Sequence, residues 1–120
     1  MKTTRLFLVI AGMMIATSSA LAHPFLKSAD PKPNATIAAS PTHIRIGFSE
    51  GLEGGFSGIE VNDEKGHAVS SGSAAVDPTD STQLIVLLKG KLAPGKYTVK
   101  WYAVGGDAHR MTGRYSFQVK

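Results

Sequence analysis

Short runs of alternating apolar and polar residues, separated by turn-forming clusters, constrain this chain most. In HIRIGFS (43–49), Ile44, Ile46 and Phe48 fall on one face of an extended strand. The same period of two recurs in GIEVN (58–62), KYTVKWYAV (96–104) and RYSFQV (114–119). Clusters of Gly, Pro, Asn and Asp, such as those at 62–66 and 77–80, lie between the runs. No stretch of ten residues after the first 22 carries a helical apolar stripe. The pattern predicts an all-β, Ig-like Greek-key sandwich or barrel of about seven strands.

Two further patterns assign residues to the interior of this sandwich. The run LIVLL (84–88) is apolar throughout, which predicts a central strand covered on both faces. Core positions are also expected on one face of each of the last two strands: Tyr97, Val99, Trp101 and Ala103 on one, and Tyr115, Phe117 and Val119 on the other.

The first 22 residues are expected to lie outside the fold. Lys2 and Arg5 precede the apolar run LFLVIAGMMI, and the segment ends Ala-Leu-Ala at 20–22. This layout is typical of a secretory signal peptide cleaved after Ala22, which leaves a domain of residues 23–120 beginning with His23. An uncleaved N-terminal anchor is the alternative.

Charge and cysteine content exclude several classes of function. Only two of the 13 Lys and Arg residues lie in 1–22, so the domain sets 11 cations against 9 Asp and Glu. This small excess of positive charge is too low to indicate a nucleic-acid partner. The chain has no cysteine, which excludes disulfides, thiolate zinc sites and cysteine redox chemistry.

The strongest candidate site combines His23, Asp107 and His109. As the first residue after cleavage, His23 offers an α-amine and an imidazole nitrogen that can chelate one ion. Asp107 and His109 are separated by one residue, and on an extended backbone their side chains point to the same side. Nitrogen and oxygen donors in such a mixture favour Cu(II). Pro24 has no amide proton that copper could displace, so His23 must recruit its other ligands from elsewhere in the fold.

The remaining polar residues are weaker candidates for a functional site. Glu50, in FSEGLEGG, is a candidate to orient an imidazole ligand by a hydrogen bond, although a solvated strand end explains it equally well. His43 alternates with core residues and is expected on a solvated face. His67, beside a turn, is expected to be structural or solvated. No Ser-His-Asp arrangement can be argued.

Several of these segments together resemble the CopC copper resistance family, including its YobA-like members. They are HPFLKSADPKPNATI, FSEGLEGGFSG, APGKYTVKWYAV, and D-A-H followed by TGRYSFQVK. The resemblance spans residues 23–120 and implies a seven-stranded Greek-key copper-binding domain in the periplasm. Its Cu(II) ligands fall on His23, Asp107 and His109, and Glu50 matches the family's F-S-E motif. The Met-rich loop with which some members bind Cu(I) has no counterpart, because VNDEKGHAVSSGS contains no Met.

The expected function is therefore that of a periplasmic copper carrier or buffer in copper homeostasis and resistance. It would be a monomer that binds one Cu(II) and is not an enzyme. The resemblance makes an inner-membrane copper transporter of the CopD type a candidate partner, and neither nucleic acid nor, after cleavage, a membrane is expected to bind. Two alternatives stay open: a copper-dependent oxidase or monooxygenase, and a structural β-sandwich that serves as an interaction module.

Overall fold

The computed structural model describes residues 24–120, which form eight strands and one turn of 3₁₀ helix. The predicted signal peptide and His23 lie outside this range. Within it, no helix has the length and apolar character needed to cross a bilayer. The elements are β1 (Leu26–Asp30), β2 (Thr36–Ile37), β3 (His43–Phe48), η1 (Gly54–Phe56), β4 (Gly58–Asn62), β5 (Ser70–Asp77), β6 (Asp80–Leu88), β7 (Gly95–Val104) and β8 (Arg110–Val119).

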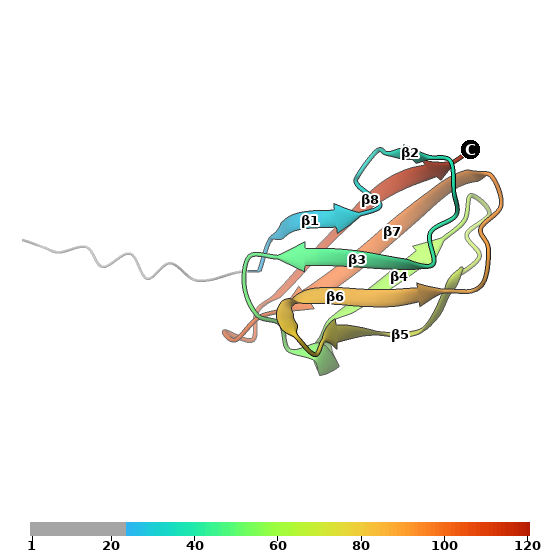
Figure 1. Ribbon diagram of the computed structural model, residues 1–120. Coiled ribbons are helices and arrows are strands. Elements are labelled where there is room, and N and C mark those ends of the chain that lie inside the picture. Colours follow the sequence, from blue (N-terminus) through green and yellow to red (C-terminus); the bar gives the residue numbers. More distant parts are fainter. Residues whose placement is uncertain (1–23) are drawn as a thin grey trace, which may run out of the picture.

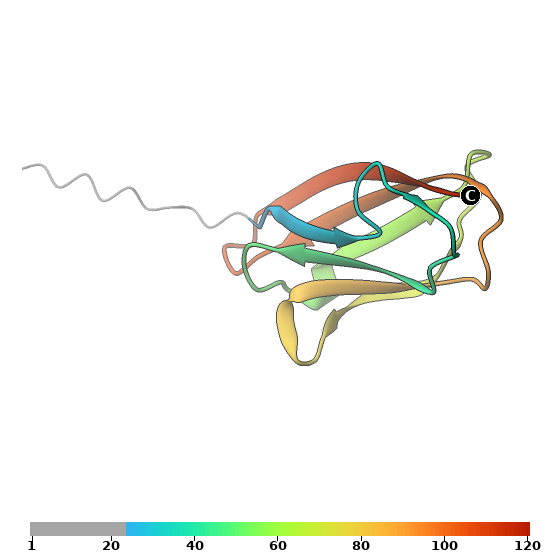
Figure 2. The ribbon, with the colours of Figure 1, turned by 45° about the horizontal axis from the view of Figure 1, so that its top comes forward.

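The strands form two four-stranded sheets that pack face to face. One has the order β1-β3-β6-β5, and the other β2-β8-β7-β4. Figure 1 labels the strands, and the tilted view of Figure 2 separates the two layers. All pairings are antiparallel except that of β2 with β8. The chain changes sheet at every connection except β5–β6 and β7–β8, which join neighbours in the same sheet. The all-β Greek-key sandwich predicted from the sequence is confirmed, and the two-residue β2 accounts for the extra strand.

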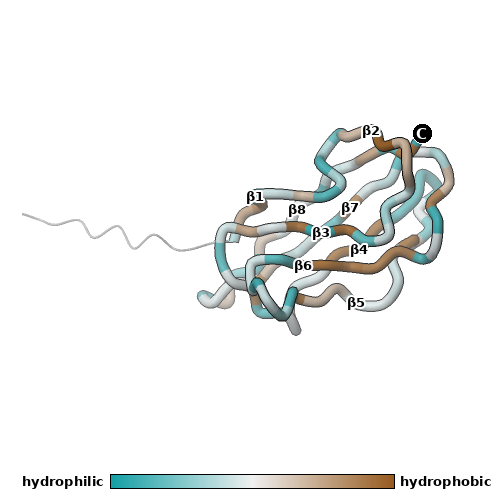
Figure 3. The backbone as a smooth tube through the Cα atoms, viewed as in Figure 1, coloured by the Kyte–Doolittle hydropathy of each residue, from teal (hydrophilic) through white to brown (hydrophobic). Residues whose placement is uncertain are grey.

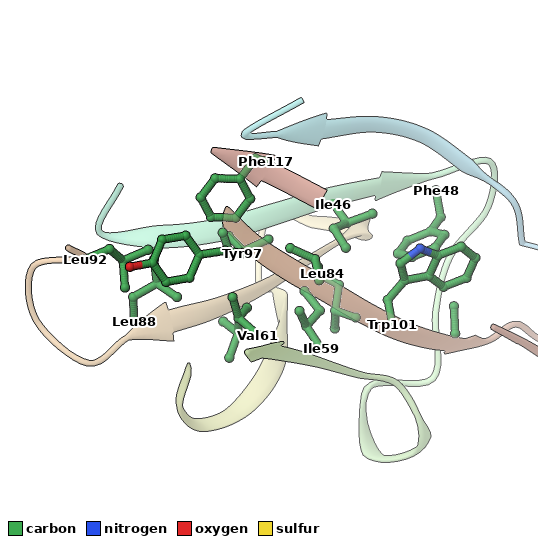
Figure 4. Packing of buried hydrophobic residues seen from close by; sticks show 14 of the residues in the cluster. Ile46, Phe48, Ile59, Val61, Leu84, Leu88, Leu92, Tyr97, Trp101 and Phe117 are labelled. Carbon is green, nitrogen blue, oxygen red and sulfur yellow. The ribbon is translucent and has the colours of Figure 1, made fainter. Parts of the chain in front are cut away.

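The inner faces of both sheets supply one hydrophobic core, and the alternation read from the sequence places it correctly. Ile44, Ile46 and Phe48 from β3 are each at most 3% exposed. Aromatic pairs link the sheets and strands: the Phe48 and Trp101 rings meet edge to face at 5.1 Å, and Tyr97 stacks on Phe117 at 5.5 Å (Figure 4). Offset or edge-on pairs of this kind add to the stabilisation from burial alone.

The prediction that residues 84–88 are covered on both faces is wrong. Leu84, Val86 and Leu88 are buried, but Leu87 on the opposite face is 62% exposed. β6 does lie between β3 and β5, and its second half is strongly hydrophobic in Figure 3. However, a two-layer sandwich covers only the inner face of each sheet, so the outward side chains of a central strand still meet water.

β5 and β1 form strands that the sequence pattern did not indicate. β5 (SSGSAAVD) consists largely of small residues with low strand propensity, and it is pale in Figure 3. It is held by pairing with β6, interrupted by an irregularity between Ser71 and Ala75 that includes Gly72 at φ +71°. Backbone pairing with a strong neighbour therefore outweighs the weak propensity of this edge strand.

One buried polar group gives a testable dependence of stability on pH. The Tyr115 hydroxyl is shielded from solvent and has no hydrogen-bond partner within residues 24–120. Burial, assisted by the charge of Asp30, raises the pKa of Tyr115 above its ordinary value of 10.0. The folded state therefore holds this proton more tightly than the unfolded chain does. As a result, the contribution of Tyr115 to the free energy of unfolding is constant below pH 10 and decreases as the pH rises further.

We expect Tyr115→Phe to leave the free energy of unfolding at neutral pH unchanged or raise it by up to about 1 kcal/mol, because it removes an unpartnered polar atom. The variant should also lose less stability between about pH 9 and about pH 11. Urea unfolding at both pH values measures this. Part of the alkaline loss should remain, since burial also raises the pKa of Tyr97. An unchanged alkaline slope would show that Tyr115 is not responsible.

Candidate metal centre

The turn between β7 and β8 carries two of the predicted site residues. β7 ends at Val104, which pairs with Arg110 at the start of β8. The intervening turn is closed by a hydrogen bond of 3.1 Å from the Ala108 amide to the Gly105 carbonyl. Ala108 has φ 63°, a left-handed conformation that is uncommon for a residue with a side chain. The sequence Gly-Gly-Asp-Ala-His therefore forms a compact turn rather than a continuation of the strand.

Asp107 and His109 lie together in this turn. Asp107 Oδ1 accepts a hydrogen bond of 3.1 Å from the His109 amide, an Asx-type contact that fixes the carboxylate against the backbone. Its Oδ2 lies 3.3 Å from His109 Nδ1. The expected convergence of the two side chains is present, but the reason given for it, an extended backbone, is wrong. The left-handed residue between them brings the side chains together.

Glu50 reaches the same turn from the end of β3. Gly105 is buried and carries no side chain, and the Glu50 carboxylate occupies the space beside its Cα. A Cβ at this position would overlap Glu50 Oε1 and would lie 3.2 Å from Pro24 Cδ. Glu50, Gly105 and Pro24 are therefore in close contact, and the absence of a side chain at Gly105 makes that contact possible.

The start of the described chain is fixed at this end of the sandwich. Pro24 is less than 2% exposed. The Phe25 amide donates to Ser49 Oγ at 3.0 Å, and the Ser49 amide donates to the Phe25 carbonyl at 2.9 Å. In Figure 1 the start of β1, the end of β3 and the β7–β8 turn lie at one end of the molecule, and the C-terminus lies at the other. The residue that follows His23 is thus anchored beside Glu50 and Gly105.

A buried serine that the sequence did not single out ties the turn to the segment after β3. Ser57 is 6% exposed; its hydroxyl accepts from the Val104 amide at 3.0 Å and donates to the Glu53 carbonyl at 3.0 Å. The Glu53 amide in turn donates to the Val104 carbonyl at 2.8 Å. These bonds hold the end of β7, and therefore the turn with Asp107, in a fixed position. The only signal in the sequence was the place of Ser57 in the FSEGLEGGFSG stretch.

The donors present fit a small cation with a preference for nitrogen and oxygen, but they do not complete a site alone. Within residues 24–120, no group of three or more His, Asp or Glu side chains is placed to hold a metal ion. The third ligand expected from the sequence, His23, lies outside the described residues. His67 is exposed and 3.7 Å from Asp63, and the side chain of His43 contacts Thr42, so neither lies in the turn that carries Asp107.

Comparison with known proteins shows the family to which this sandwich belongs. The family model of the CopC domain matches residues 26–120, which is most of the chain. The chain belongs to the CopC family. A protein named YobA from Escherichia coli (strain K12) is 39% identical over 119 residues, covering 99% of this chain and 96% of its own. A protein named copper resistance protein C from Escherichia coli is 39% identical over 108 residues, covering 85% of each chain.

Solved CopC structures share the fold described above. The crystal structure of CopC from Methylosinus trichosporium OB3b superposes with a TM-score of 0.75 at 32% identity, covering 82% of this chain and 94% of that one. PcoC, a methionine-rich copper resistance protein from Escherichia coli, superposes with a TM-score of 0.71 at 36% identity, covering 82% of this chain and 100% of its own. The sandwich is thus a CopC domain in both sequence and architecture.

Proposed function

We propose that this CopC-family chain is a periplasmic protein that binds one Cu(II) and carries or buffers it in copper homeostasis. The observation that carries the proposal is the pairing of Asp107 and His109, 3.3 Å apart, beside the anchored residue Pro24. Relatives named copper resistance protein C support copper as the ion. The layout of residues 1–22 supports export and cleavage after Ala22.

The proposed ligands are the α-amine and imidazole of His23, together with Asp107 and His109. An N-terminal amine with an adjacent imidazole forms a chelate, and two further donors complete a mixed nitrogen and oxygen set of the kind that Cu(II) prefers. Because Pro24 is buried and Phe25 is hydrogen-bonded to Ser49, the chain leading to His23 has little freedom left to lose on binding. The protein's part in this chemistry is to hold the donors, not to react.

A second, Cu(I) site rich in thioethers does not form part of this proposal. PcoC is described as methionine-rich. Here three of the four Met residues lie in the first 22 residues, and Met111 is the only one after them. Soft Cu(I) favours sulfur ligands, so the residues after cleavage suit one oxidation state of copper.

A Cu(II) titration of the mature protein, followed by electron paramagnetic resonance, tests the proposal. We expect one nitrogen-rich Cu(II) per chain. Because an amine and an imidazole must both be deprotonated to coordinate, the affinity should fall by about 100-fold or more between about pH 7.5 and about pH 5.5. An affinity that does not change with pH, or the absence of tight binding, would contradict the proposed function. Peroxide-driven oxidation above that of free copper would instead support the oxidase alternative.

Glu50 is proposed to orient a ligand rather than to bind copper. We expect Glu50→Gln to weaken Cu(II) binding by about tenfold, in the range typical of partners that position metal ligands. Competition with a chromogenic chelator measures the change. Glu53→Gln is the matched control, since Glu53 is exposed and three residues further along the chain. Equal losses in both variants would mean that only net charge matters.

A further inference from the structure

The outward face of the sheet β2-β8-β7-β4 carries an excess of positive charge. Side chains that alternate with the core residues of β7 and β8 point to solvent. The exposed cations among them are Lys96, Lys100, Arg110 and Arg114, which we call the basic face. Glu60 on β4 is the one carboxylate among the outward residues of β4, β7 and β8. This single face therefore concentrates more positive charge than the domain as a whole, with its 11 cations and 9 anions.

Two of these cations stand directly opposite each other. Lys100 on β7 pairs with Arg114 on β8. Directly opposed side chains on one face of a sheet lie about 5 Å apart at Cβ, and like charges in that position are unfavourable. The ion pairs found within residues 24–120 involve Arg45, His67 and His109, and none of the cations of the basic face. Lys100 also stands opposite Glu60 on β4, which offsets part of this repulsion. Arg114 has only Lys100 opposite it in the β7–β8 register, so its charge is left to attract an anion from outside.

The surface between these side chains is hollowed. A depression of about 410 Å³ is lined by Trp101 and Gly113 together with the polar and charged residues Glu60, Lys100, Tyr102, Arg110, Thr112 and Arg114. The Arg110 guanidinium lies 4.3 Å from the centre of the Tyr102 ring, a cation–π contact that holds it in place. Tyr102 itself packs over Gly58 of the neighbouring strand. The depression therefore brings together three cations, of which Arg110 is held in place, with the Thr112 hydroxyl and the Glu60 carboxylate on the same surface.

The chemistry of the face favours a polypeptide over a membrane as its partner. Proteins that bind anionic bilayers combine cations with apolar side chains that enter the lipid. Three of the four large exposed apolar side chains, Phe25, Phe56 and Leu87, lie outside the strands of this sheet. The fourth, Tyr102 on β7, packs over Gly58 and is covered by the Arg110 guanidinium. Glu60 within the patch would repel a uniformly anionic surface, whereas a polypeptide can place a donor against it.

We propose that the basic face binds an acidic segment of a partner protein, with one carboxylate held between Lys100 and Arg114. Arg110 directly follows His109, so a partner seated here lies beside the turn that carries Asp107. If copper binds there, as proposed above, the docked partner is next to it; that last step rests on the proposed function, but the docking itself does not.

The test uses the metal-free mature protein and a fluorescein-labelled peptide of alternating Glu and Gly, with fluorescence anisotropy as the readout. We expect binding that weakens as salt is added. The double variant Lys100→Gln/Arg114→Gln should raise the Kd about tenfold, because it removes both proposed contacts. The matched control Lys27→Gln/Lys89→Gln removes the same charge from exposed positions in β1 and after β6, and should change the Kd less than about twofold.

Three results would overturn the proposal: no binding of the Glu peptide, equal weakening by the two double variants, or binding to phosphatidylglycerol vesicles but not to the peptide. Equal weakening would mean that only the net charge of the protein matters. Binding to vesicles alone would mean that the face contacts a membrane. Because no copper is present, failure here leaves the copper proposal intact. Conversely, a protein that binds the peptide but not copper would retain the docking face and lose the carrier function.

Discussion

A single Met placed before His23 should lower the Cu(II) affinity of the mature protein by about 100-fold or more. The added residue moves the α-amine away from the imidazole and breaks the proposed chelate. Since the loss of a residue that merely orients a ligand already costs about 10- to 100-fold, the loss of a ligand should cost at least as much. Chelator competition gives the affinity, and the hyperfine pattern in electron paramagnetic resonance reports the number of nitrogen donors.

The other proposed ligands provide the companion test and its control. His109→Ala should weaken binding to a similar extent, whereas His67→Ala should not, because His67 is exposed and contacts Asp63 rather than the turn. If the extended and native chains bind alike, the α-amine is not a ligand. In that case the site must be rebuilt around Asp107, His109 and Glu50.

Trp101→Ala should destabilise the domain by about 3–5 kcal/mol, the range seen when a large aromatic side chain is removed from a core. Trp101 is 9% exposed and meets Phe48 edge to face, so truncation leaves a cavity between the two sheets. Urea unfolding measures the loss. Native domains have about 5–15 kcal/mol of stability, so the loss is a large fraction of the total.

Gly113 provides a finer test of the same packing. It stands directly opposite Trp101, and a Cβ at this position would overlap the indole ring. Gly113→Ala should therefore cost about 1–3 kcal/mol in the native background and much less in the Trp101→Ala background. Gly55→Ala is the control, because nothing lies within 4 Å of the added Cβ. Equal costs of Gly113→Ala in the two backgrounds would show that the indole does not limit this site.

The candidate site was only partly predictable from the sequence. The spacing of Asp107 and His109 indicated that they could converge, and in the structure they are 3.3 Å apart. They converge because the left-handed Ala108 lies between them in a turn, and not because of the extended backbone expected from the sequence. The contact of Glu50 with Gly105 and Pro24 joins segments more than 25 residues apart along the chain. The role of Ser57 depends on its hydrogen bond to Val104, which no local pattern indicates.

The fold, too, was predicted from the sequence only in part. Period-two alternation placed the buried residues of β3, β4, β7 and β8 correctly, because the pleat of a strand sends successive side chains to opposite faces. The continuous apolar run of β6 gave no such information, and the exposure of Leu87 followed only from the number of layers. β5 was not indicated because its small residues have no strong strand preference, and it depends on pairing with β6.

The sequence by itself therefore determined the all-β class and the faces of the alternating strands, and it named the candidate metal ligands. These properties follow from side-chain chemistry and from a period of two, both of which are local. The tertiary structure alone decided that Glu50, Gly105 and Pro24 meet beside Asp107, and that Lys100 and Arg114 stand side by side. Such contacts depend on strand order and register, which are set by packing two whole sheets around one core.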